Sequence, residues 1–177
     1  MRYAIWIVML ITGAAHAAPA DEAVGKAASA FYQACLDLKP MGVPDSALRA
    51  KLRPLVSPGL DGLLAAADAA ETRYAERTKK EVPPLVQGDL FTSLFEGATR
   101  FTVASCTGDA SAASCLVDFA YQEGSGPVTA WQDRVHLVRA GAGWVVDDVA
   151  YGGGWPFARR GRLSDVLKAV VREADKQ

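Results

Sequence analysis

Two carboxylates in one predicted β-hairpin have the residue types and spacing to do chemistry. The stretch 131–155 alternates β-branched and aromatic residues around a short glycine-rich turn, which predicts two antiparallel strands. If Arg139 lies opposite Trp144, then Asp133 and Asp148 lie diagonally on one mostly apolar face, about 7 to 8 Å apart at the backbone. Desolvation and a second carboxylate both raise a carboxyl pKa, and sites of proton transfer are made in this way.

The same pattern permits a structural interpretation of these acids. Arg139 or backbone amides of a neighbouring loop would then satisfy both carboxylates, and a bulge in the hairpin would exchange Asp148 with Asp147 between the two faces. The hairpin also supplies the candidate ligand-binding residues, which combine aromatic rings with charged groups and are Trp131, Asp133, Arg139, Trp144, Asp148 and Tyr151.

Metal chemistry is not expected from this composition. His136 is the only histidine besides His16, and the chain has three cysteines, so neither a multi-histidine nor a thiolate zinc site can be assembled. We therefore predict no metal and no cofactor. The register above places His136 opposite Asp147, where a cross-strand charge pair is favoured over a catalytic triad because no nucleophile motif is present.

The cysteines predict one disulfide and one free thiol. Cys106 ends one predicted strand and Cys115 begins the next, with a turn-rich segment between them, so a hairpin brings them together. Cys35 falls on the apolar stripe of a predicted helix, which favours a buried, unreactive thiol.

The first seventeen residues are typical of a secretory signal peptide. Arg2 precedes an apolar run over 4–15, and the segment ends in Ala15-His16-Ala17, a small-x-small cleavage site, so we expect cleavage between Ala17 and Ala18. The run is shorter than the roughly 20 residues that span a bilayer. This predicts a periplasmic or secreted protein with one domain over 18–177 and no stable membrane insertion.

Overall composition is that of an ordinary globular domain. Half of the 177 residues are hydrophobic, 22% are charged and the formal net charge is −1. No cluster of lysine and arginine is present to displace counterions from a phosphate backbone, so nucleic acid is not an expected partner.

The order of predicted elements indicates an α+β fold. Apolar residues at helical spacing predict helices over 21–38 and 58–80, with Ser57 capping the second, and a further helical region starting near 45. Alternation then predicts strands over 99–106 and 115–122 before the hairpin, and a last apolar stripe predicts a helix over 164–175. Helices packed on a curved antiparallel sheet, with a C-terminal helix, follow from this order.

Several motifs resemble those of the nuclear-transport-factor-2-like (cystatin-like) superfamily, an α+β cone. They include Ala30-Phe31-Tyr32, the 55–60 entry to a long helix, and the strand Gly143-Trp144-Val145-Val146-Asp147-Asp148-Val149. Together with the segments 88–91 and 93–97, they are similar to exported bacterial proteins of unknown function with that fold. The resemblance covers about 21–175 and implies a curved sheet wrapped on helices, leaving a cone-shaped pocket.

These observations favour an exported, non-catalytic binding domain. Its partner would be a small apolar ligand in the pocket or another protein of the cell envelope, as for an accessory or immunity protein. The alternative is a cofactor-free proton-transfer or hydrolytic enzyme that uses Asp133 and Asp148. An open pocket would favour the small ligand, whereas a cone filled by Trp131, Trp144 and Phe119 would favour a protein partner.

Overall fold

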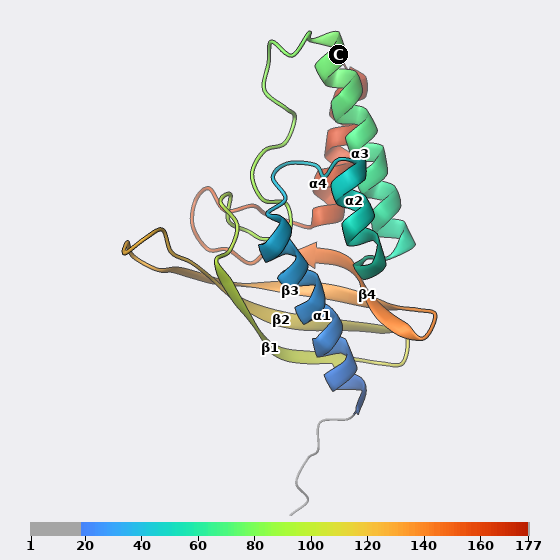
Figure 1. The fold of residues 1–177 in the computed structure, drawn as a ribbon, viewed down its shortest axis with the longest axis vertical. Coiled ribbons are helices and arrows are strands. Elements are labelled where there is room, and N and C mark those ends of the chain that lie inside the picture. Colours follow the sequence, from blue (N-terminus) through green and yellow to red (C-terminus); the bar gives the residue numbers. More distant parts are fainter. Residues whose placement is uncertain (1–18, 177) are drawn as a thin grey trace, which may run out of the picture.

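Helices on one side of a four-stranded antiparallel sheet make up the fold of this chain (Figure 1). The computed structural model describes residues 19–176, so the predicted signal peptide and its cleavage site lie outside the described residues. In chain order the elements are α1 (Pro19–Leu38), α2 (Ser46–Leu52), the short 3-10 helix η1 (Arg53–Leu55), α3 (Pro58–Arg77), β1 (Arg100–Gly108), β2 (Ala112–Tyr121), β3 (Thr129–Ala140), β4 (Gly143–Ala150) and α4 (Leu163–Lys176). The predicted α+β fold, with helices first, an antiparallel sheet second and a closing helix, is confirmed.

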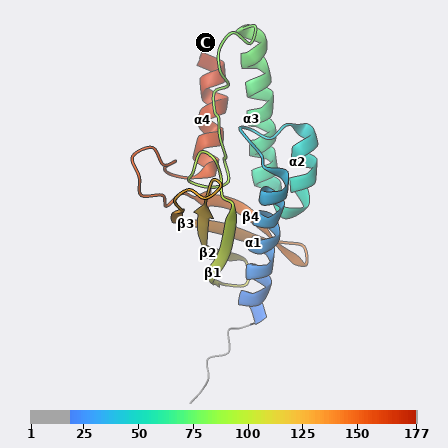
Figure 2. The same ribbon diagram turned by 60° about the vertical axis from the view of Figure 1, so that its left-hand side comes forward.

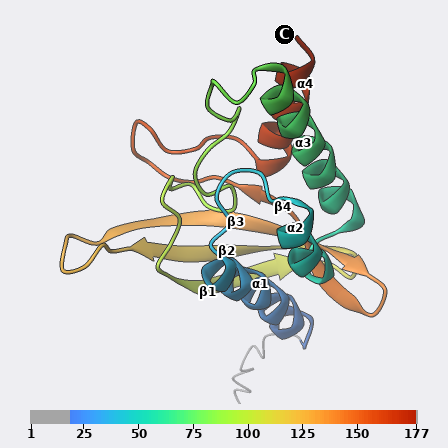
Figure 3. The ribbon, with the colours of Figure 1, turned by 45° about the horizontal axis from the view of Figure 1, so that its top comes forward.

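α1 lies across one face of the sheet and buries its apolar stripe there (Figure 3). Phe31 and Tyr32 are almost completely buried, and the ring of Tyr32 makes an edge contact with Phe119 of β2 at 4.9 Å between centroids. Phe31 packs in the same manner against Phe91, which comes from the segment between α3 and β1. Burial of such rings is worth about 1.5 to 3 kcal/mol each, which fixes the helix on the sheet.

α3 and α4 pack side by side next to β4 (Figure 2). The predicted cap of α3 is present, because the Ser57 hydroxyl accepts a hydrogen bond from the Leu60 amide at 3.0 Å. That hydroxyl also donates to Asp147 of β4 at 2.6 Å, so one side chain both starts the helix and ties it to the sheet.

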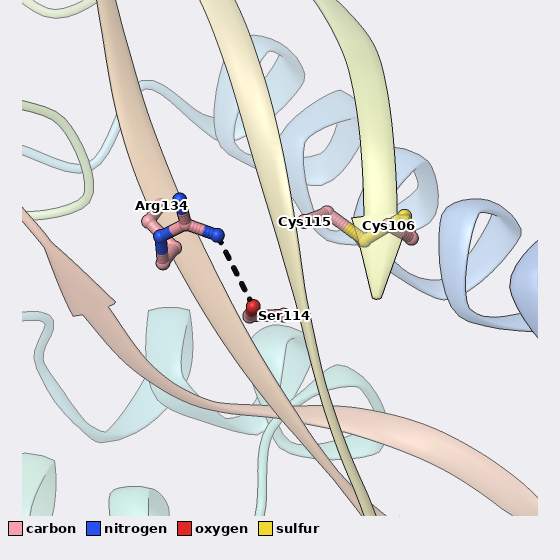
Figure 4. Close-up of a disulfide and its surroundings, with 4 residues drawn as sticks. All are labelled: Cys106, Ser114, Cys115 and Arg134. Atoms are coloured by element: carbon pink, nitrogen blue, oxygen red, sulfur yellow. Dashed lines mark hydrogen bonds between the residues drawn. A yellow bond between two sulfur atoms is a disulfide. The ribbon is translucent and has the colours of Figure 1, made fainter. Parts of the chain in front are cut away.

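The predicted disulfide between Cys106 and Cys115 is present and joins β1 to β2 (Figure 4). The two residues are register partners on adjacent strands, with Cα atoms 4.0 Å apart. Nearby on β2, the Ser114 hydroxyl accepts a hydrogen bond from Arg134 of β3 at 3.3 Å.

A bulge in the β3–β4 hairpin changes the predicted register. Arg139 pairs with Trp144 and Leu137 with Val146 as expected, but the register then shifts, and His136 lies opposite Asp148 instead of Asp147. Directly opposite residues share a face, so Asp148 lies on the face of His136, away from that of Asp133. The prediction that Asp133 and Asp148 share one apolar face is therefore wrong, because the register shifts between Leu137 and His136.

The segment between α3 and β1 is an irregular loop. The Asp89 amide donates to the Phe95 carbonyl at 2.8 Å, and the Asp89 carboxylate accepts from the Phe91 amide at 2.8 Å. Gly88 and Gly97 both have positive φ, and a Cβ at Gly88 would stand 2.5 Å from the Phe95 ring. Glycine is therefore needed at this end of the loop.

The hydropathy of the helices can be compared with the prediction of no stable membrane insertion. From residue 19 to residue 176, no helix combines the length and the apolar character needed to cross a membrane.

Candidate functional site

Asp133 is a fully used hydrogen-bond acceptor in the interior. The residue is 1% exposed, and its two carboxylate oxygens accept from the Ser93 amide (2.9 Å), the Ser93 hydroxyl, the Trp131 indole nitrogen (3.0 Å) and the Gly152 amide (2.8 Å). Ser93 belongs to the irregular loop before β1, and Gly152 belongs to the loop after β4. A buried carboxylate with four donors holds these loops in place and has no free lone pair aimed at a substrate.

Asp148 has other hydrogen-bond partners than Asp133 and stabilises another part of the fold. Its carboxylate accepts from the amide and hydroxyl of Ser164 at 3.0 and 2.8 Å and from the Val149 amide at 2.9 Å, and it faces Arg162 at 3.5 Å. Because Ser164 lies in the first turn of α4, Asp148 stabilises the helix start, where a negative charge is favourable. The start of α4 is thus capped by a side chain of β4.

The remaining predicted ligand residues are also spread through the fold. Trp131 is buried, stacks on Phe119 and donates to Asp133. Arg139 lies over the ring of Trp144 at 5.3 Å, near the β3–β4 turn. The structure brings Trp131 and Asp133 together, but it does not gather all six candidates around one cavity.

Tyr151 completes the set as a loop anchor. Its hydroxyl donates to the Leu90 carbonyl at 2.6 Å, and burial raises the pKa of that hydroxyl far above its usual range. The group therefore stays protonated and serves as a hydrogen-bond donor to the loop before β1.

A pocket of about 260 Å³ opens beside these anchors, between the C-terminal half of α1, the loop before β1, and the first two strands. Its wall is mostly apolar and includes Leu36, Met41, Ala98, Phe101 and Phe119. Phe119, the residue on which Trp131 stacks, is the link between this pocket and the hairpin. Trp131, Trp144 and Phe119 are all buried in the core, and the pocket lies beside Phe119.

Tyr32 lines the pocket and carries a buried hydroxyl that has no hydrogen-bond partner within the described chain. Burial raises the pKa of this hydroxyl well above its usual range, and the charge of Asp133 raises it further. The hydroxyl therefore stays protonated and is a hydrogen-bond donor without an acceptor. Cys35 lies one helical turn further on and is the free thiol of the wall. Burial raises its thiol pKa, which agrees with the expected unreactive thiol.

Asp89 is the one acid of the pocket wall that lies in the interior. It is 7% exposed and accepts from the Thr92 hydroxyl at 2.6 Å as well as from the Phe91 amide. Burial raises the pKa of its carboxyl to about 6, although these hydrogen bonds and Arg159 act in the opposite direction. A group that changes charge near pH 6 at a pocket wall makes binding there sensitive to pH.

This shift predicts a pH dependence of folding. The Asp89 carboxyl has a pKa near 3.8 when exposed and about 6 when folded, so the folded chain holds the proton more tightly. Stability from this group is therefore complete below about pH 4 and decreases by up to about 3 kcal/mol as the pH rises to 6 and above. Asp89→Asn should remove most of that decrease in urea unfolding at pH 4 and 6.5. The exposed Asp118→Asn should leave it unchanged, and an unaltered profile in Asp89→Asn would contradict the assignment.

The sequence did not identify the residues that line this pocket, because they come from three separate stretches of the chain, 32–41, 89–101 and 119–121. The clearest signal for it was the pair of glycines at 88 and 97 around Asp89, which indicates a closed loop instead of a helix. Tyr32 was visible only as part of the apolar stripe of α1.

Comparisons with protein-family models, with curated proteins and with solved structures found no match for this chain. Within residues 19–176, no group of three or more histidine, cysteine or acidic side chains is arranged to hold a metal ion.

Proposed function

We propose that this protein is an exported binding domain that holds a small, largely apolar molecule in the pocket between α1, the loop before β1, and strands β1 and β2. The observation that carries the proposal is the unpartnered buried hydroxyl of Tyr32, a residue that lines an apolar cavity, because a ligand oxygen or nitrogen that reached this hydroxyl would satisfy it. The volume of about 260 Å³ is just below the roughly 300 to 1,000 Å³ of typical small-molecule sites, which supports a compact ligand of up to three rings.

Polar groups of the wall support a ligand with one polar end. Tyr32 offers a donor, and Asp89 offers a carboxylate whose remaining lone pairs can accept. The rest of the wall supplies apolar contact, which gives affinity without directional demands.

The geometry gives little support to the alternative enzyme that uses Asp133 and Asp148. The two acids lie on opposite faces of the hairpin, and each is held by backbone amides and serine side chains. A general base needs a lone pair within hydrogen-bond reach of a substrate proton, and these lone pairs are already occupied.

A periplasmic or secreted location is part of the proposal. The disulfide between Cys106 and Cys115 supports it, because such bonds persist in oxidising compartments. Membership of the nuclear-transport-factor-2-like superfamily is likewise proposed, on the motifs given above and on the order of elements.

The experiment is a fluorescence titration with N-phenyl-1-naphthylamine, a neutral probe in which an NH group joins a naphthalene ring system to a phenyl ring. We expect saturable binding to the chain beginning at Ala18, and about tenfold or greater weakening in Ala98→Phe, because the new ring occupies the pocket. Ala104→Phe is the matched control, since Ala104 is exposed on β1 at the register shift and outside the pocket.

Each variant should first be shown to unfold as cooperatively as the parent chain. Equal probe affinity in Ala98→Phe and Ala104→Phe would contradict the proposed site. Loss of affinity in Ala104→Phe alone would place the probe on the exposed strand surface instead.

A further inference from the structure

Three exposed large apolar side chains, Met41, Phe95 and Phe157, lie close together on the surface. Phe157 is 96% exposed, and the others in residues 19–176 are Met41 (55%), Phe95 (52%), Val128 (47%) and Val82 (43%). Phe157 and Phe95 line one open cleft of about 340 Å³, together with Pro84. A second cleft joins Phe95 and Pro84 to Met41. Exposed apolar patches of this kind mark interaction sites.

Phe157 stands on a protruding loop, 151–162, that connects β4 to α4. In two views rotated from the first, this loop extends away from the sheet and the helices (Figure 2, Figure 3). Its base is tied down by the Gly152 amide on Asp133, the Gly153 amide on the Ser93 hydroxyl at 3.0 Å, and the Arg159 amide on the Ser93 carbonyl at 3.0 Å. The aromatic ring is therefore held out in water by an ordered base.

Charge on this surface is positive, in contrast to the net charge of −1 for the whole chain. The loop 151–162 contains three arginines and no acid. The adjoining stretch 82–95 contains a single acid, the buried Asp89, and is bordered by Glu81 and Glu96.

Two of the three arginines have no carboxylate partner in the described part of the chain. Arg159 donates to the carbonyls of Gln87 and Asp89 at 3.0 Å, and Arg160 donates to the Trp155 carbonyl at 3.3 Å. Arg162 faces Asp148. Arg159 also acts on the nearby Asp89 carboxylate, so Arg160, three residues after the exposed ring, is the arginine of this loop with no carboxylate near it in the described residues.

We propose that the loop 151–162 docks this protein on an anionic phospholipid bilayer, with Phe157 entering the interface and Arg160 meeting lipid phosphates. An aromatic side chain next to arginine is suited to this boundary, because the ring enters the apolar side while the guanidinium stays among the headgroups. The ring of Phe157 is almost fully exposed on a loop that protrudes from the fold, so it can enter a fluid surface, which needs no matching shape. The docking is peripheral and is separate from the ligand pocket.

The test is flotation of the chain beginning at Ala18 with vesicles of phosphatidylcholine alone, or of phosphatidylcholine and phosphatidylglycerol in equal parts. We expect binding to the anionic vesicles only, weakened by added salt. Phe157→Ser should weaken it roughly tenfold, and Arg160→Gln about fivefold. Val128→Ser is the matched control, because Val128 is exposed on the separate β2–β3 connection, and it should change binding by less than about twofold.

A second measurement reports the ring position directly. Tryptophan emission of Phe157→Trp should shift to the blue with anionic vesicles and be quenched by brominated lipid, whereas Val128→Trp should do neither. Absence of vesicle binding by the parent chain would overturn the proposal, as would equal binding of Phe157→Ser and Val128→Ser. Equal affinity for neutral and anionic vesicles would overturn the role of the arginines and with it the proposal.

Discussion

Asp133→Ala is expected to lower the free energy of unfolding by about 3 to 5 kcal/mol, because it leaves several buried donors without an acceptor at once. The amides of Ser93 and Gly152 and the indole of Trp131 all end on this carboxylate. Ser93 and Trp131 are both buried, so water cannot take the place of the lost carboxylate without a rearrangement of the surrounding chain. Urea unfolding of the variant and the parent chain measures the difference.

Asp133→Asn sharpens this prediction because it preserves shape and removes one acceptor. Each carboxylate oxygen receives two donors, so the amide nitrogen of asparagine must face two hydrogen-bond donors at either orientation. We expect a loss of about 2 to 4 kcal/mol. The control is Asp118→Asn, an exposed acid on β2 that contacts only Gln132, for which a change within about 0.5 kcal/mol is expected.

Hydrogen exchange distinguishes an anchoring role from a general loss of stability. In Asp133→Asn the amides of Ser93 and Gly152 should exchange faster than the amides of α3, which has no contact with this carboxylate. An Asp133→Asn chain as stable as the parent would show that the four donors are not essential to the fold.

Removal of the Cys106–Cys115 disulfide is the second change with a large expected effect. The bond closes a short loop, with a sequence separation of 9, and the chain-entropy relation gives roughly 2 to 3 kcal/mol for a loop of this size. Cys115 is also fully buried, so the double variant Cys106→Ala/Cys115→Ala adds the loss of packed sulfur. We expect a total decrease of about 3 to 4 kcal/mol in the free energy of unfolding.

A reducing agent supplies the control for this measurement. Reduction should destabilise the parent chain and leave the double variant unchanged, because Cys35 is the remaining cysteine and has no bridge to lose. A double variant that is still destabilised by the reductant would point to an effect outside this bond.

Local signals in the sequence were sufficient for most of the fold. Ser57 followed by proline identified the start of α3, and the apolar stripe of α1 identified the face that carries Phe31. The disulfide followed from strand ends and a turn between them. In each case the determining residues lie within about a dozen positions of one another, where periodicity and capping act directly.

The bulge could not be located from the sequence because its two outcomes are nearly equivalent there. Asp147 and Asp148 are consecutive and chemically identical, so exchanging their faces leaves the alternation pattern intact. What decides between them is distant: Ser57 takes Asp147, and Ser164 takes Asp148. These contacts span 90 and 16 positions of the chain.

The pocket and the Asp133 anchor have the same origin in long-range contacts. The sequence identified Asp133 as an acid on an apolar face. The donors that occupy its carboxylate oxygens come from Ser93, 40 residues earlier, and Gly152, 19 residues later. No spacing rule joins such positions. Whether the Tyr32 hydroxyl has a hydrogen-bond partner depends on all the residues around it, so its lack of one can be recognised only in the complete fold.

The most direct test of the central claim is nuclear magnetic resonance mapping of N-phenyl-1-naphthylamine on the isotope-labelled chain. The pocket account predicts shift changes concentrated at Cys35, Thr92, Ala98 and Thr99, with little change at Arg139 and Trp144. Changes confined to the β3–β4 hairpin, or to the exposed loop around Phe157, would contradict it.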